Sequence, residues 1–115
     1  MPEAQGREVF YFEDADGSSP VGSWLEHLAR KKPRAAQRID AKIDRLERGN
    51  LGDCRSVGDG VSELEVDEGP GYRLYVGQHG KVVVLLHANI KGSKSNQQAD
   101  IKLAQQRWRE WKEGG

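Results

Sequence analysis

The sequence lacks the features that mark secreted, membrane-spanning or disulfide-stabilised proteins. It has a single cysteine, Cys54, so no disulfide can form within the chain, and this composition fits a reducing cytoplasm. No apolar run approaches the roughly 20 residues that are needed to cross a bilayer. The first ten residues contain no basic stretch followed by an apolar one and therefore predict no secretory signal. We expect a cytoplasmic protein without a membrane partner.

Repeats, heptads and low-complexity tracts are also missing, which excludes solenoids and coiled coils. A chain of 115 residues is long enough for one modest hydrophobic core and too short for two independent ones. Hydrophobic residues make up 36% of the chain and charged residues 31%, as in a small protein with a large surface relative to its volume. We therefore expect one domain that spans residues 1–115.

The net charge is zero, but the charges are segregated along the chain. Residues 1–23 carry a net −4 and residues 24–48 a net +4, whereas residues 49–71 carry −5 and residues 72–115 carry +5. A chain arranged in this way could present one basic surface to a nucleic acid. Solvated Lys and Arg on helix surfaces explain the same pattern, and charge alone favours that simpler explanation.

Residues 61–90 predict three consecutive strands joined by two tight turns, at 69–71 and 78–81, where Gly and Pro favour chain reversal. Alternation places Leu64 and Val66 on a core-facing side of the first strand. The third strand, residues 81–87, is almost continuously apolar, as expected for a central strand covered on both faces. Polar side chains gather on the face opposite Leu64 and Val66, where chemistry is most readily placed: Glu63, Glu65, Arg73 and Tyr75.

The segments before this meander predict a strand and two helices. Residues 8–13 are short, aromatic and apolar, which favours a strand. Ser23-x-x-Glu26 matches a capping box and predicts the start of a helix that ends before Pro33. A second helix over 33–48 places its apolar residues at spacings of three and four. Residues 51–60 predict a polar connection between this helix and the meander.

The last predicted helix follows a second capping-box pattern, Ser95-x-x-Gln98, and ends before the terminal glycines. Its apolar stripe is Ile101, Ala104, Trp108 and Trp111. The expected fold class is α+β, with a strand, a helical hairpin, a three-stranded antiparallel meander and a C-terminal amphipathic helix. We expect the helices to cover one face of the sheet and the opposite face to stay partly open.

Three groups of residues, taken together and in this order, resemble the RelE/ParE toxin superfamily of bacterial toxin–antitoxin pairs. They are Glu63-Leu64, the turn and strand at 69–73, and Lys94-x-x-Gln97-x-x-Asp100-Ile101. The sequence is most similar to the HigB-like addiction module killer proteins, over most of the chain from Trp24 to the last helix. The resemblance implies a RelE-like fold and a metal-independent, ribosome-dependent mRNA endonuclease that uses no cofactor. It also implies mRNA, the ribosome and a cognate antitoxin as partners.

The resemblance and the residue chemistry together give a set of candidate site residues. In such a reaction the RNA 2′-hydroxyl is the nucleophile. Arg73 would stabilise the developing phosphate charge, Lys94 would act as base or phosphate ligand, and His87 is a further candidate acid. A histidine in a strand is more often a structural hydrogen-bonding group than an acid. The candidate RNA-binding residues are Arg30, Lys31, Lys32, Arg34, Lys91 and Tyr75.

Two departures from the family pattern weaken the nuclease prediction. Glu65 occupies the position where related toxins carry a second arginine, and it is expected to lie near-diagonal to Arg73. The stretch 87–93 replaces the shorter glycine-rich segment that usually precedes Lys94, and Lys91 could supply part of the missing positive charge. The alternative prediction is a non-catalytic member that acts by protein binding, as a gyrase inhibitor or an antitoxin-docking remnant. An RNA-binding domain without a toxin role ranks third.

Overall fold

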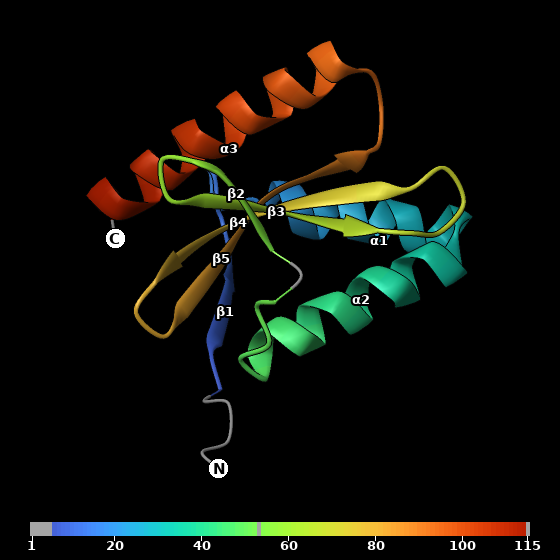
Figure 1. Ribbon diagram of the computed structural model, residues 1–115, viewed down its shortest axis with the longest axis horizontal. Helices are drawn as coiled ribbons and strands as arrows, with labels where there is room; N and C mark the ends of the chain where they lie inside the picture. The colour runs from blue at the N-terminus through green and yellow to red at the C-terminus, as the bar shows by residue number, and fades with distance from the viewer. Residues whose placement is uncertain (1–5, 53, 115) are drawn as a thin grey trace.

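The computed structural model of the protein describes residues 6–52 and 54–114. Part of the N-terminal stretch in which the sequence predicts no secretory signal lies outside these residues. The described residues contain every element of the predicted α+β fold (Figure 1). In chain order the elements are β1 (Glu8–Tyr11), α1 (Pro20–Lys31), α2 (Pro33–Glu47), β2 (Arg55–Gly58), β3 (Val61–Val66), β4 (Tyr72–His79), β5 (Val82–Ile90) and α3 (Lys94–Gly114).

The five strands form one sheet in the order β1-β5-β4-β3-β2. β3, β4 and β5 are the predicted antiparallel meander, and β1 pairs in parallel with β5. Gly69 and Gly71 adopt positive φ angles of 56° and 86° in the β3–β4 turn, which glycine reaches without steric cost. The predicted strand-free connection over 51–60 is wrong, because β2 pairs there with β3. Four residues with an irregular register are too few to give an alternating pattern in the sequence.

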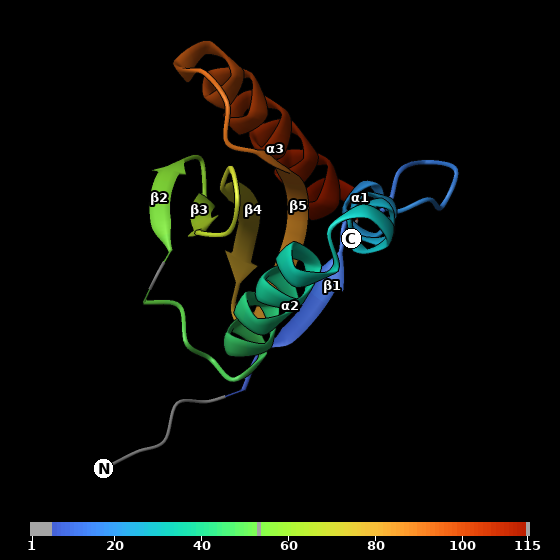
Figure 2. The same cartoon turned by 90° about the vertical axis from the view of Figure 1, so that its right-hand side faces the viewer.

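Helices cover both faces of the sheet, so the prediction that they cover only one is wrong (Figure 2). α1 and α2 pack on the face formed by Leu64, Leu74 and Leu85. α3 packs on the opposite face through Ala104 and Trp108. The apolar side chains of β5 pack against the helices on both faces of the sheet, as the sequence pattern predicts. A strand pattern shows that two faces are apolar, but it does not show which helix covers each one.

Trp108 fixes α3 against the sheet because Gly77 of β4 leaves room for its indole ring. A Cβ atom at Gly77 would collide with the indole ring of Trp108. Trp108 is buried and stacks on Trp111 at a centroid distance of 5.3 Å. Trp108 is therefore a core packing residue, as expected for the apolar stripe of this helix, and the partly buried Trp111 packs on it.

Two helices begin at a different serine from the one that the sequence indicates. α1 starts at Pro20, and the hydroxyl oxygen of Ser19 accepts a hydrogen bond from the Gly22 N–H at 3.0 Å. α3 starts at Lys94, and Ser93 accepts from the Asn96 N–H at 3.3 Å. The predicted caps at Ser23 and Ser95 are therefore wrong, since both residues lie inside their helices. The capping-box pattern recurs inside helices, and only the backbone conformation shows which serine acts as the cap.

Several chain reversals lie at one end of the sheet (Figure 1). The α1–α2 connection, the β3–β4 turn, the end of β5 and the start of α3 meet there, while the β4–β5 turn lies at the other end. A hydrogen bond of 2.9 Å from the Lys91 N–H to the Gly71 carbonyl joins β5 to the β3–β4 turn. This end gathers most of the candidate RNA-binding residues.

Candidate functional site

A buried carboxylate, Glu63, is the centre of the polar cluster between the sheet and α3. Its side chain is 1% exposed. Glu63 Oε1 accepts a hydrogen bond of 2.6 Å from Nη2 of Arg55, and Oε2 accepts bonds of 2.9 Å from the Tyr75 hydroxyl and from Nε2 of Gln97. A carboxylate tolerates such burial only when it is paired and fully hydrogen-bonded. Glu63 therefore joins β2, β4 and α3 through one charged group.

The same contacts set the protonation states of this cluster. Burial by itself raises the pKa of Glu63, but the hydrogen bonds from Gln97, Tyr75 and Arg55 and the charge of Arg55 outweigh it. The resulting pKa of Glu63 lies below the ordinary value of 4.5. Burial, the hydrogen bond to Glu63 and its negative charge raise the pKa of the Tyr75 hydroxyl. Near neutral pH Glu63 is thus ionised and Tyr75 keeps its proton.

Arg73 lies in β4 directly opposite Glu65 of β3, whereas the sequence predicts a diagonal placement. The Arg73 side chain is 12% exposed. Its Nε atom lies 3.8 Å from Oε2 of Glu63 and 3.8 Å from Oε1 of Glu65. At these distances the charges attract without forming hydrogen bonds. Nε and Nη1 of Arg73 are buried and donate to no acceptor.

The Arg73 cluster holds more cations than carboxylates when Arg73 itself is counted. Nζ of Lys91 donates to Oε2 of Glu65 at 3.1 Å, so Glu65 lies between two cations. With Arg55, three cations surround the two carboxylates Glu63 and Glu65. Lys42 of α2 also lines the hollow beside Arg55 and these acids. Together Arg55, Arg73, Lys91, Glu63 and Glu65 therefore carry a net positive charge.

The first turn of α3 brings Gln97, and not Lys94, into the Glu63 cluster. Lys94 is the exposed first residue of the helix, and no hydrogen bond or ion pair joins it to Arg73 in the described part of the chain. Gln97 and Asp100 lie one and two turns further on and face the sheet, where they contact Glu63 and His87. The spacing Lys94-x-x-Gln97-x-x-Asp100 thus places two polar residues on the face of the helix that packs on the sheet.

His87 is held by a network of its own. Its Nε2 lies 2.8 Å from Oδ1 of Asp100, and Nη1 of Arg107 lies 3.4 Å from Nδ1. The ring stacks on Tyr75 at a centroid distance of 5.9 Å. An arginine can only donate, so it directs the Nε2 proton of a neutral His87 toward Asp100. These contacts are those of a structural hydrogen-bonding residue.

The remaining candidate RNA-binding residues differ in their accessibility. Tyr75 is fully buried, so its ring has no free face on which a base could stack. Four cations at the end of the helical hairpin are exposed; we call them the basic tip, which consists of Arg30, Lys31, Lys32 and Arg34. Arg34 approaches Glu68 of the β3–β4 turn at 3.9 Å. Lys31 and Lys32 form no ion pair with any residue that the structure describes.

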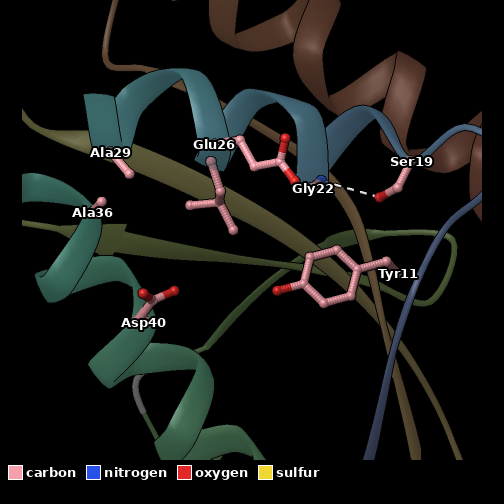
Figure 3. Close-up of a pocket in the computed structure, with 8 residues that line it drawn as sticks. Tyr11, Ser19, Gly22, Glu26, Ala29, Ala36 and Asp40 are labelled. Atoms are coloured by element: carbon pink, nitrogen blue, oxygen red, sulfur yellow. Dashed lines mark hydrogen bonds between the residues drawn. The ribbon is translucent and has the colours of Figure 1, made fainter. Parts of the chain in front are cut away.

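A separate pocket lies between α1, α2 and β1, away from the Arg73 cluster (Figure 3). Its apolar lining comes from Leu25, Ala29 and Ala36. The hydroxyl of Tyr11 points across it toward Asp40, and burial and the charge of Asp40 raise the pKa of Tyr11. No Lys or Arg lines this pocket, so it does not suit a phosphate.

Sequence reasoning missed the hydrogen-bonded roles of Glu63, Gln97 and Asp100. The alternation of β3 placed Glu63 beside Glu65 on one face, but only the packing of α3 shows that one is buried and the other 43% exposed. Among the residues that the structure describes, no three His, Cys, Asp or Glu side chains come together to hold a metal ion. Within the same residues, no helix is both long and apolar enough to span a bilayer.

Comparison with known proteins gives two matches. An uncharacterized protein of Haemophilus influenzae is 51% identical over 83 residues, which cover 71% of this chain and 79% of the relative. No solved structure matches the chain significantly. Residues 23–109, which include the helical hairpin, the meander and most of α3, match the model of a family of phage-derived proteins. This chain therefore belongs to the Gp49-like family of phage-derived proteins (DUF891).

Proposed function

We propose that this protein is the toxin of a type II toxin–antitoxin pair, of the RelE/ParE kind, and that it cleaves mRNA in the ribosome without a metal. Gp49-like proteins are a toxin-like family related to addiction modules, which supports the first part of the proposal. The observation that supports the second is the Arg73 cluster, where a cation with unused donors belongs to a group of side chains with a net positive charge.

Arg73 would act on the phosphate of the RNA. Its buried Nε and Nη1 have no acceptor, and an unsatisfied buried donor is costly unless a ligand completes it. A phosphate oxygen that displaced the Glu65 carboxylate would accept from the guanidinium fork at close range. Lys91, now paired with Glu65, would then also face the phosphate. The 2′-hydroxyl of the ribose is the nucleophile, and the 5′-oxygen of the next nucleotide is the leaving group. Lys94, exposed at the start of α3, is the candidate phosphate ligand.

The pocket between α1, α2 and β1 supports a protein partner at a second place. Its apolar lining and its acidic residues, Glu26 and Asp40, fit an apolar side chain that is followed by Lys or Arg in the partner. RNA would be repelled there. We assign this pocket to the antitoxin, which would then leave the Arg73 cluster accessible from the other face of the sheet.

A cell-free translation assay with the purified protein tests the nuclease proposal. We expect dose-dependent cleavage of the message in translating ribosomes, and at least about a hundredfold lower cleavage for Arg73→Gln, because one transition-state donor is worth this much. Arg109→Gln is the matched control, since Arg109 is exposed and pairs with Asp59 on another part of the surface. Intact message at every dose, beside an active family toxin, would contradict the proposal.

The pairing of Arg73 with Glu65 favours a second candidate function, a non-catalytic toxin that binds a protein target. Glu65→Arg separates the two. If RNA cleavage is the activity, removing the carboxylate frees Arg73, and growth arrest and message cleavage both increase. Unchanged growth arrest without any cleavage would instead assign the activity to protein binding.

A further inference from the structure

The end of the molecule that carries the basic tip also holds a pocket that the proposed cleavage chemistry does not use. The pocket lies between the α1–α2 connection and the β3–β4 turn. Its apolar lining consists of Pro33 and Pro70, which are exposed, and of Ala35 and Tyr72, which are buried. Tyr72 is fixed by an edge-to-face contact with Trp24 at a centroid distance of 5.8 Å. The pocket therefore offers an apolar surface beside the charged one.

One polar group in this pocket lacks a hydrogen-bond donor. Oε1 of Glu68 is buried and accepts no hydrogen bond. Nε of Arg34, at 3.9 Å, is too far away to donate, and the Arg34 side chain is 86% exposed. A buried carboxylate oxygen without a donor is costly, and a ligand that brings N–H groups would remove that cost. The last torsion of a glutamate is soft, so a small rotation can turn this oxygen toward the pocket.

The cations at the rim complete the chemical description of the ligand. Lys31, Lys32 and Arg34 line the same pocket, and the two lysines are exposed without an acidic partner among the described residues. A ligand that satisfies all three features has an apolar face, carries N–H donors on one edge and bears a negative charge nearby. Nucleotides have this combination.

We propose that this pocket binds the base of a nucleotide and prefers guanine. Guanine offers two parallel donors, N1–H and the N2 amino group, to one carboxylate. Adenine and cytosine offer one amino group on that edge, and uracil offers one N–H between two carbonyl oxygens that Glu68 repels. The phosphate lies against Lys31 and Lys32. The inference rests on the proposed function, because it assigns a base preference to the RNA that reaches the same end of the sheet.

Titration with the four nucleoside 5′-monophosphates tests the preference. NMR detects binding through the amide resonances of Gly69 and Gly71 in the β3–β4 turn. GMP is expected to bind about tenfold more tightly than UMP, the difference made by a hydrogen bond to a charged group. Glu68→Gln abolishes this preference, whereas Asp67→Asn, which removes a charge from the same turn but lines a different hollow, retains it. Equal binding of all four nucleotides by the wild type, or no saturable shift with GMP, overturns the proposal.

Two further measurements show whether the base belongs to RNA or to a free nucleotide. They also show whether the pocket proposal and the nuclease proposal fail independently. If the pocket takes RNA, the oligonucleotide UUGUU shifts the same resonances as GMP and UUUUU does not. If only free GMP shifts them, the pocket serves a nucleotide ligand and the base preference still holds. Message cleavage by a protein that binds no GMP would leave the nuclease proposal intact and remove this one. GMP binding without message cleavage would do the reverse.

Discussion

At the scale of single residues, Glu63 organises the centre of the molecule. It is the shared acceptor for donors from β2, β4 and α3, and it is ionised although its side chain is buried. Breaking a buried charge network from one side leaves the partners unsatisfied, so the cost exceeds that of a surface ion pair. Glu65, its neighbour on the same strand face, is partly exposed and forms ion pairs with Arg73 and Lys91.

Glu63→Ala is therefore expected to lower the free energy of unfolding by about 3 kcal/mol. The matched change Glu65→Ala is expected to cost less than about 1 kcal/mol, because exposed ion pairs contribute little. Urea denaturation followed by circular dichroism measures both. Equal losses in the two variants would show that Glu63 is not the structural acceptor that its contacts indicate.

The pH dependence of stability provides a second check on Glu63. Its folded pKa lies below the unfolded value, so ionised Glu63 stabilises the fold above the ordinary glutamate pKa of 4.5. This contribution is lost as the pH falls through the folded pKa. We expect the free energy of unfolding to decrease below about pH 4.5 and to decrease less steeply in Glu63→Gln. Parallel pH profiles in the two proteins would contradict this assignment.

At the scale of elements, the caps and the sheet-facing side of each helix decide how the helices sit. α1 depends on Ser19 and Pro20, since Pro20 at the first position has its φ angle already set for a helix. α3 is held at its start by Gln97 and along its length by Trp108. Polar contacts thus fix the position of α3 at the end where the candidate site lies.

The cap of α1 can be tested with two serines four residues apart. Ser19→Ala removes the acceptor for the Gly22 N–H and is expected to lower the free energy of unfolding by about 1 kcal/mol. Ser23→Ala lies inside the helix on its exposed side and is expected to leave stability unchanged or raise it by about 0.5 kcal/mol. Thermal unfolding of both variants provides the comparison. A larger loss for Ser23→Ala would restore the cap that the sequence pattern indicates.

At the scale of the whole molecule, the alternating charge blocks of the sequence partly neutralise each other. Arg34 reaches Glu68, and Arg55 reaches Glu63. Arg38, Lys42 and Arg45 of α2 line a hollow together with Glu65 and Asp67. Much of the basic charge of α2 therefore lies beside acidic residues of β3 and the β3–β4 turn. The basic tip and the Arg73 cluster remain as the positive features at one end of the sheet.

A charge reversal at each end of the sheet tests whether RNA binds at the basic tip. Lys31→Glu combined with Lys32→Glu is expected to weaken binding of single-stranded RNA by about tenfold or more at low salt, and to make the remaining affinity less sensitive to salt. Lys81→Glu, in the β4–β5 turn at the opposite end, is expected to change neither quantity. Fluorescence anisotropy over a range of salt concentrations measures both. Similar losses at the two ends would show that net charge, and not the tip, determines binding.

The sequence by itself determined the elements that local patterns encode. Alternation defined the meander, spacings of three and four defined the helices, and the glycines at 69 and 71 defined a turn. β2 was not predictable, because its four residues carry no pattern and pair only because β3 offers a free edge. The helix starts were misplaced because the serines that act as caps, Ser19 and Ser93, lack the Glu or Gln three residues later that the capping-box pattern requires.

Tertiary structure alone decided which polar residues are buried and which cations stay free. Glu63 and Glu65 have the same chemistry and lie on the same face of one strand, yet α3 covers the first and leaves the second partly exposed. Arg73 and Lys94 are equally plausible in the sequence, but only Arg73 contacts the cluster, since the first turn of α3 directs Gln97 toward it. Burial and charge pairing depend on contacts between distant segments, and a strand or helix pattern describes each segment only by itself.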